Sequence, residues 1–293
     1  MKDQLPQLIN IPPFIQRIHS NQSKSGISKI LLIIKGKITQ ILIKYVEGNL
    51  FCVLMNYLYK EHSRIGFQNN LYFKKINDEI LVYYPNKRIT RAINRENYIF
   101  HNLFDSYCLN DIEFQKGDLV IDCGANIGEL NIAFNLKGFD IEYLGVEPES
   151  KTFICLEKNK MRESDKFLNL ALSNTSSEER LYLDSLGGNS SIVYFGNDDF
   201  EIIKTQTLDS LNIQKEIKLF KLEAEGFEPE ILEGGLSTLK KIKFIAVDFG
   251  SERGLDEENT VVKVNNLLYS NNFSLVSFSD FRYIGLYKNN SLK

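Results

Sequence analysis

Short apolar runs that end in polar residues recur along the second half of the chain. They lie at residues 119–121, 143–146, 167–171, 217–222 and 244–247. Helical spacing fills the intervals, including those before the fourth and fifth runs, and this alternation predicts βαβ units and a mainly parallel sheet. Two adjacent runs at 273–278 and 283–287 close the chain as a predicted hairpin, which would add one antiparallel strand to the sheet.

The first 110 residues have a different pattern. Residues 27–59 have mostly helical spacing, with Gly36 and Gly48 as candidate breaks. Residues 71–84 carry β-formers between polar turns, and residues 96–107 again show helical spacing. We therefore expect a mixed α/β extension, residues 1–110, ahead of an α/β domain that covers residues 111–293.

Charge is distributed unevenly between these two parts. The whole chain has 35 Lys and Arg against 38 Asp and Glu, a net charge of −3. Residues 1–110 hold 15 basic and 7 acidic residues, or +8, whereas residues 111–293 hold 20 and 31, or −11. The overall balance argues against nucleic acid as a partner. The asymmetry indicates either two functional halves, the first being a lid or the contact of a homo-oligomer, or two differently charged solvated faces.

Cysteine and histidine usage excludes several classes of protein. The four cysteines form no Cys-x-x-Cys pair, so a disulfide framework and a zinc ribbon are excluded and a cytoplasmic location fits best. The three histidines form no His-x-x-x-His pair, and we expect no metal site. The amino terminus lacks the apolar core of a signal peptide.

The most apolar stretch of the chain is Ile30–Val46. Lys35, Lys37 and Lys44 interrupt it, so it predicts no transmembrane segment. It is typical either of a helix that packs on the main domain or on a second subunit, or of an amphipathic helix on an anionic membrane surface. The first interpretation is favoured because most apolar stripes belong to a core.

Acidic residues mark the ends of four predicted strands. They are Asp122, Glu147, Glu223 and Asp248. Ligands of open α/β sheets bind beyond the carboxyl ends of the strands, where the strand order reverses. The acidic strand ends therefore predict a ligand site.

A glycine-rich turn follows the first strand, from Asp122 to Gly128. Asn126 stands where a dinucleotide fingerprint has its second glycine, which weakens a nicotinamide interpretation and favours a ligand without phosphates, such as S-adenosylmethionine. Glu147 lies 19 residues after Gly128, where a carboxylate accepts hydrogen bonds from ribose hydroxyls. Its alternative role is to cap the helix that follows Pro148.

Four ordered blocks carry a resemblance to a known family. Residues 117–129, 146–148, 169–173 and 221–228 resemble the cofactor and signature motifs of the FkbM-type methyltransferases, and the resemblance covers roughly residues 96–288. It implies a Rossmann-like, class I methyltransferase sheet and S-adenosylmethionine as cofactor. The implied cofactor residues are Asp122, Gly124, Ala125, Asn126, Gly128, Glu129, Glu147, Pro148, Ala171, Leu172 and Ser173. The chain departs from the family at Glu223, where the family usually has Asp.

The block 221–225 supplies the candidate catalytic residues. Lys221 and Glu223 share one face of a strand, and Glu225 enters the turn after it. We expect Glu223, and next Glu225, to accept the proton of the methylated hydroxyl. Lys221 serves either the site or a structural ion pair with Glu225. His101 is the one imidazole close in sequence to the core half, as an alternative base or a core residue.

Two loops supply candidate substrate contacts. Asp248 and Arg253 flank a Gly-punctuated loop that suits sugar hydroxyls or a phosphate, or else forms an ordinary surface ion pair. Asn189 and Ser190 lie in a small-residue loop that resembles one near the family's site, or a plain turn. Family members commonly methylate hydroxyls of sugars in capsules, lipopolysaccharides or other glycans, or secondary metabolites. The resemblance therefore implies an O-methyltransferase of a sugar or nucleotide-sugar acceptor, with a nicotinamide-dependent oxidoreductase and a non-catalytic cofactor-binding scaffold as alternatives.

Overall fold

The computed structural model describes residues 26–60, 64–76, 80–93, 98–184, 190–251, 253–279 and 282–292. The chain divides into two compact units, Met1–Tyr98 and Ile99–Lys293. Residues 99–110 belong to the second unit because Phe104 packs there, with its ring centroid 4.9 Å from that of Phe134 and 5.9 Å from that of Phe139.

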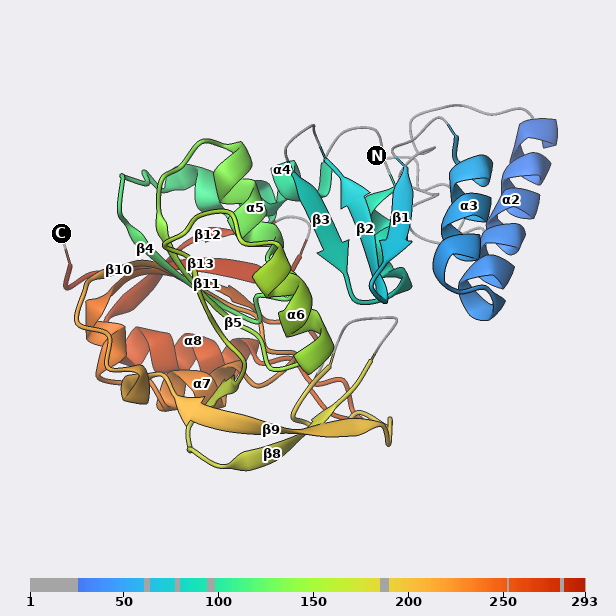
Figure 1. The fold of residues 1–293 in the computed structure, drawn as a ribbon. Coiled ribbons are helices and arrows are strands. Elements are labelled where there is room, and N and C mark those ends of the chain that lie inside the picture. Colours follow the sequence, from blue (N-terminus) through green and yellow to red (C-terminus); the bar gives the residue numbers. More distant parts are fainter. Residues whose placement is uncertain are drawn as a thin grey trace. The chain divides into compact units, whose positions relative to one another are not determined.

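The first unit has two helices followed by a small antiparallel sheet (Figure 1). Its elements are α2 (Gly26–Tyr45), α3 (Gly48–Leu58), β1 (Ile65–Gln68), β2 (Leu71–Lys75), β3 (Leu81–Tyr84) and the 3-10 helix η1 (Lys87–Ala92). Gly48 starts α3 with a φ of +60°, as the sequence predicted, whereas Gly36 does not break α2 and lies buried within it. A short strand that the sequence did not predict, β1, pairs with β2.

The second unit is built on a seven-stranded sheet. Its strands are β4 (Leu119–Cys123), β5 (Glu142–Val146), β6 (Lys166–Leu168), β10 (Ile217–Leu222), β11 (Ile242–Asp248), β12 (Phe273–Phe278) and β13 (Ile284–Asn289). The spatial order is β12-β13-β11-β10-β4-β5-β6, and β13 runs antiparallel to both of its neighbours. The predicted mostly parallel sheet with an antiparallel carboxyl-terminal hairpin strand is confirmed.

Helices cover both faces of this sheet. They are α4 (Tyr98–Ser106), α5 (Glu129–Leu136), α6 (Ser150–Lys158), α7 (Glu228–Glu233) and α8 (Val261–Ser270), with short 3-10 segments η2 (Leu109–Asp111), η3 (Asp209–Leu211) and η4 (Thr238–Lys241). Helices α5 and α6 lie on one face and α7 and α8 on the other (Figure 1). The apolar core between α7, α8 and the sheet includes Phe220, Ile231 and Leu268.

One region of this unit differs from the sequence prediction. The predicted α-helix before β10 is absent from the described residues. This interval of the chain instead contains β8 (Glu178–Tyr182) and β9 (Phe200–Thr207), which pair antiparallel. The predicted third strand is divided as well: β6 stays in the main sheet, while β7 (Ala171–Ser173) leaves it and pairs in parallel with β9. The hydrophobic period of a segment indicates which of its side chains are buried, but it does not indicate which other strand the segment pairs with.

The strand order reverses between β4 and β10, which pair in parallel. The register places Lys221 opposite Asp122 and Leu222 opposite Cys123. The carboxyl ends of β4 and β10 therefore lie side by side, at the position where open α/β sheets bind ligands.

Candidate active site

The glycine turn after β4 lies directly against the end of β10. Gly124 has a φ of +71°, and a Cβ atom built on it would lie 2.0 Å from the carbonyl oxygen of Glu223. Asn126 adopts a left-handed φ of +51°, and Gly128, with a φ of +89°, is the N-cap of α5. Only glycine satisfies both the left-handed backbone and the close approach at position 124.

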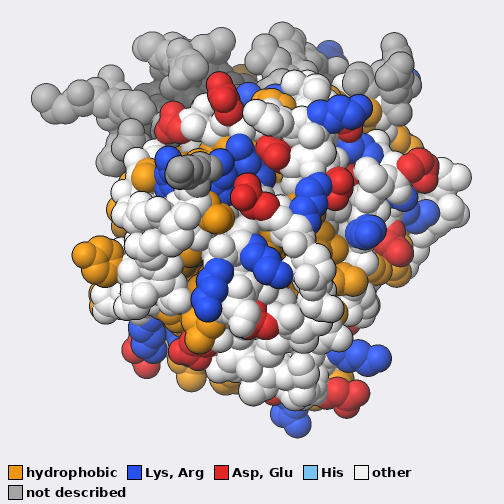
Figure 2. Space-filling view, turned by 90° about the vertical axis from the view of Figure 1, so that its left-hand side faces the viewer, with side chains coloured by type: hydrophobic (Ala, Val, Ile, Leu, Met, Phe, Trp, Pro, Cys, Tyr) orange, Lys and Arg blue, Asp and Glu red, His pale blue; other side chains and the backbone are white. Residues whose placement is uncertain are grey.

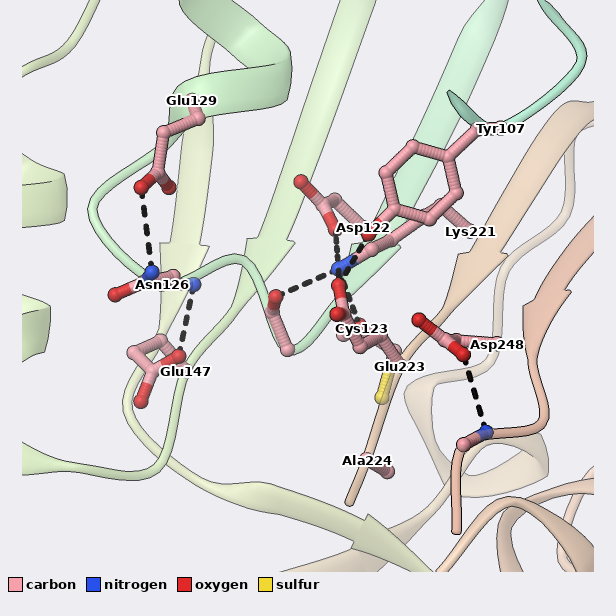
Figure 3. Close-up of polar contacts among 12 residues, drawn as sticks. Tyr107, Asp122, Cys123, Asn126, Glu129, Glu147, Lys221, Glu223, Ala224 and Asp248 are labelled. Carbon is pink, nitrogen blue, oxygen red and sulfur yellow. Dashed lines mark hydrogen bonds and ion pairs between the residues drawn. The ribbon is translucent and has the colours of Figure 1, made fainter. Parts of the chain in front are cut away.

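Glu147 joins this turn to the segment that leads into α6. Its Oε2 accepts a hydrogen bond from the Asn126 backbone N–H at 2.8 Å (Figure 3). Its Oε1 accepts one from the Glu149 N–H at 3.0 Å. The residue is only 7% exposed, and this burial raises the pKa of Glu147 to about 8. Each carboxylate oxygen accepts more than one hydrogen bond, so two hydroxyl donors are compatible with these contacts.

Lys221 is buried at the centre of a cluster of charged side chains at the end of β10 (Figure 3). Its Nζ lies 3.0 Å from Asp122 Oδ1 and 3.1 Å from Glu223 Oε2, and it donates to the carbonyl oxygen of Gly124 at 2.7 Å. Burial alone would lower the pKa of Lys221, but the two carboxylates and Tyr107 raise it well above its ordinary value. Lys221 therefore keeps its charge and connects β4, the glycine turn and β10.

Glu223 binds a second cation and a phenol. Arg282 Nη2 lies 2.5 Å from Glu223 Oε1, and the Tyr107 hydroxyl donates to Oε2. Burial alone would raise the pKa of Glu223, but Lys221, Arg282 and the Tyr107 hydrogen bond lower it strongly. Glu223 is thus held ionised over the whole range in which proteins are usually assayed.

Arg282 extends the cluster to the next strand, because its guanidinium also pairs with the carboxylate of Asp248. Burial raises the pKa of Asp122 even though Lys221 and the hydroxyl of Tyr143 act against it. With all groups ionised, three carboxylates face two cations among the described residues, so this set carries one excess negative charge. Its charged members are Asp122, Lys221, Glu223, Asp248 and Arg282.

The loop after β10 is held by Glu228, the first residue of α7. Its Oε1 accepts hydrogen bonds from the N–H groups of Ala224 at 3.0 Å and Gly226 at 3.1 Å, and burial raises the pKa of Glu228 to about 7. These bonds fix the turn in which Glu225 adopts a left-handed φ of +50°. The ion pairs of Lys221 are with Asp122 and Glu223, so the alternative Lys221–Glu225 pair is not the one that the structure presents.

The predicted substrate loop after β11 is not held by an ion pair between Asp248 and Arg253. Arg253 forms a two-pronged pair with Glu230, at 2.9 and 2.6 Å, and donates to the Gly226 carbonyl oxygen. It does not pair with Asp248, whose partner is Arg282. The guanidinium of Arg253 thus stabilises the turn before α7.

The remaining predicted residues lie on several elements. Ser190 Oγ accepts a hydrogen bond from the Asp184 N–H at 3.1 Å, and Asn126 Nδ2 donates to Glu129 Oε1 at 3.3 Å. Asn189 lies outside the described residues, as does the side chain of His101 in α4. The other predicted cofactor residues lie on three segments: Ala125 is buried in the glycine turn, Pro148 follows β5, and Ala171, Leu172 and Ser173 form the buried strand β7.

Tyr107 and Arg282 are the functional candidates that the sequence did not indicate. Tyr107 lies 116 residues before Glu223, and Arg282 lies 59 residues after it. Arg282 precedes β13, whose antiparallel register with β11 places Ile284 opposite Asp248. This register brings Arg282 close to Asp248. The register depends on strand pairing, so the sequence alone did not indicate a role for Arg282.

Fold and site together define a Rossmann-like methyltransferase. A family model described as the methyltransferase FkbM domain matches residues 122–275, more than half of the chain. The chain belongs to this family, as the sequence resemblance predicted, and is an S-adenosylmethionine-dependent methyltransferase. This finding sets the nicotinamide-dependent alternative aside.

The chain is also similar, at low sequence identity, to several solved structures. A SAM-dependent methyltransferase from Aquifex aeolicus is 12% identical with a TM-score of 0.41, over 69% of this chain and 96% of that chain. Precorrin-6y C5,15-methyltransferase from Geobacter metallireducens is also 12% identical, with a TM-score of 0.38, over 73% and 97%. Sp1610 from Streptococcus pneumoniae in complex with S-adenosyl-L-methionine is 14% identical, with a TM-score of 0.36, over 61% and 69%. No curated protein sequence matches the chain.

The residues at the strand ends fit the cofactor. The buried Glu147 carboxylate has the acceptor chemistry for two ribose hydroxyls, and the excess negative charge of the Lys221 cluster suits a positively charged sulfur. When bound, S-adenosylmethionine supplies an electrophilic methyl group. The chain's residues must then orient the acceptor, exclude water and receive a proton.

Proposed function

We propose that the protein methylates a hydroxyl oxygen of a sugar or nucleotide-activated sugar, in glycan or secondary-metabolite biosynthesis in the cytoplasm. The observation that carries the proposal is the Glu223–Arg282–Asp248 arrangement at the ends of β10 and β11. Carboxylates accept hydrogen bonds from hydroxyls, and a guanidinium donates several, so together they suit a polyhydroxylated acceptor. Arg282 also offers a cationic hydrogen-bond donor for the phosphate of a nucleotide-sugar.

The mixture of charges on one face of the molecule supports an acceptor other than nucleic acid. Lysine and arginine side chains are interspersed with aspartate and glutamate on the face shown in Figure 2. A nucleic-acid interface instead gathers basic residues into a patch or stripe. Residues 1–110, with their charge of +8, are proposed to form a lid over an anionic acceptor or the contact of a homo-oligomer.

Glu223 is proposed as the group that receives the hydrogen bond of the reacting hydroxyl. General-base catalysis contributes roughly 10²- to 10⁴-fold, and its size grows as the pKa of the base approaches the working pH. Because Lys221 and Arg282 lower the pKa of Glu223, we expect a contribution near the lower end, about 10²-fold. Glu225, Lys221 and His101 are the further candidates for the catalytic set.

Turnover of a sugar-nucleotide panel with methyl-labelled S-adenosylmethionine tests this proposal. Glu223→Gln keeps the shape and removes the charge, so kcat should fall about 100-fold while affinity for S-adenosylhomocysteine changes little. The exposed Glu216→Gln is the matched control and should leave both unchanged. Because the pKa of Glu223 is lowered, kcat should show no acid limb from this residue between pH 5 and 7.

Three outcomes would redirect or refute the assignment. Loss of activity in Glu225→Gln alone moves the base to Glu225, and loss in His101→Gln alone moves it to the imidazole. Wild-type turnover in all three variants removes the proposed base. If none of the hydroxyl acceptors becomes labelled while the protein still binds S-adenosylhomocysteine, the result would contradict O-methylation and favour the non-catalytic scaffold.

A further inference from the structure

Helix α2 exposes a continuous apolar stripe. Its exposed members are between 42% and 70% accessible and are Ile30, Leu31, Ile34, Ile38, Ile41 and Tyr45. At 100° per residue they fall within an arc of about 100° that runs along about 22 Å of the helix. The opposite side holds the buried Gly36 and Thr39, and the Thr39 hydroxyl lies 2.7 Å from the hydroxyl of Tyr59. The stripe is therefore the side of α2 that its own unit leaves uncovered.

Lysines border this stripe. The exposed Lys37 and Lys44 fall about 20° and 40° beyond one edge on the helical wheel, and Lys35 falls about 40° beyond the other. The Lys44 ammonium lies 5.2 Å from the ring centroid of Tyr45, so its aliphatic stem runs beside the stripe. Helix α2 contains four lysines and no acidic residue, and α3 contains no charged residue.

The exposed side of α3 is apolar too. Leu50, Val53 and Tyr57 are 60%, 63% and 82% exposed, at spacings of three and four residues. Contiguous exposed apolar surface is rare on monomeric soluble proteins and marks an interaction site. Within the described part of the chain, no helix is long and apolar enough to cross a membrane.

We propose that the exposed side of the α2–α3 pair is an interfacial surface that binds anionic lipid membranes. An apolar helix face bordered by lysines is the pattern of helices that lie in the plane of a membrane, with the apolar side chains in the acyl boundary and the ammonium groups among the headgroups. The lysines and the apolar stripe together favour a membrane over a second copy of the chain or a nucleic acid as the partner of this surface. Two copies packed through this face would bring their lysine rows together, and a nucleic acid would leave the apolar stripe uncovered.

The test is flotation of the purified full-length protein with phosphatidylcholine vesicles, with and without phosphatidylglycerol. No cofactor or acceptor is present, so the result is independent of methyl transfer. Partitioning onto anionic vesicles should exceed that onto neutral vesicles by at least about tenfold at low salt and weaken as salt is added. Equal partitioning onto both, or none onto either, would overturn the proposal.

Matched double variants locate the surface. Ile34→Gln with Ile41→Gln should lower anionic partitioning by at least about tenfold. The control pair Val262→Gln with Tyr269→Gln on α8, also exposed and seven residues apart, should leave it unchanged. Circular dichroism confirms folding of each variant.

A second pair isolates the charge contribution. Lys37→Gln with Lys44→Gln should lower partitioning onto anionic vesicles about tenfold while leaving neutral vesicles unaffected. Light scattering measures the oligomeric state and so tests whether the surface instead binds a second copy of the chain. If the Ile34/Ile41 variant converts a dimer to a monomer and the parent protein binds no vesicles, the surface belongs to a second copy and the lipid proposal is refuted.

Discussion

Binding of S-adenosylhomocysteine should release a proton from Glu147. Burial raises the pKa of this carboxyl to about 8 in the free protein. At pH 7 it is then about 90% protonated. Ribose hydroxyls donate hydrogen bonds to the ionised form and stabilise it, so the pKa falls on binding. We expect release of up to about 0.9 proton per ligand at pH 7.

The sign of the pH dependence follows from the same shift. The neutral form of Glu147 dominates below pH 8, and forming the carboxylate there opposes binding. Affinity should therefore rise with pH, by roughly 50-fold between pH 6 and pH 8, and level off above pH 8. For the free protein the sign is opposite, because a raised folded-state pKa contributes stability that is lost as the pH rises through about 8.

Isothermal titration calorimetry in buffers of different ionisation enthalpy measures the released protons directly. Glu147→Gln should abolish the release and the pH dependence, and at pH 8.5 it should bind at least about tenfold more weakly, since charge-assisted hydrogen bonds contribute roughly 1.5–3 kcal/mol each. Glu149→Gln is an informative control. Glu149 helps to raise the pKa of Glu147, so its removal should move the affinity profile to lower pH. Proton release of zero with constant affinity from pH 6 to 9 would refute a ribose role for Glu147.

Two further predictions concern stability. Lys221→Met leaves the buried Asp122 carboxylate without its cation and facing the partly buried Glu223 carboxylate. It should lower the free energy of unfolding by roughly 3–5 kcal/mol in urea melts at pH 7, whereas the exposed Lys240→Met should stay within about 0.5 kcal/mol. Because Lys221 lowers the pKa of Glu223, the loss should shrink as the pH falls below about 4; an undiminished loss at pH 3 would contradict the ion-pair account. Gly124→Ala meets both a left-handed φ and the Glu223 carbonyl oxygen at 2.0 Å, so it should lower the melting temperature more than Gly138→Ala, which has a φ of +77° with nothing within 4 Å. Equal melting temperatures for these two alanine variants would show that the turn yields without cost.

Local patterns in the sequence predicted the strands of the main sheet and indicated the edge of that sheet where a ligand site is expected. The apolar runs and the helical spacing between them predicted the parallel sheet, because the periods of strand and helix are written in consecutive residues. Asp122, Glu147 and Asp248 were recognisable since parallel strands bring all their carboxyl ends to one edge. Gly124 was recognisable because a tight turn requires it.

Tertiary structure alone decided which charges meet. Lys221 pairs with Asp122 across the β4–β10 register, and Arg282 reaches both Glu223 and Asp248 through the antiparallel return of β13. Tyr107 enters the cluster from a segment 116 residues away from Glu223. None of these contacts has a local signal, because each depends on strand order and on burial. Burial is also what raises the pKa of Glu147, while the partners that burial brings together lower that of Glu223, so the protonation behaviour of the site is a property of the folded chain.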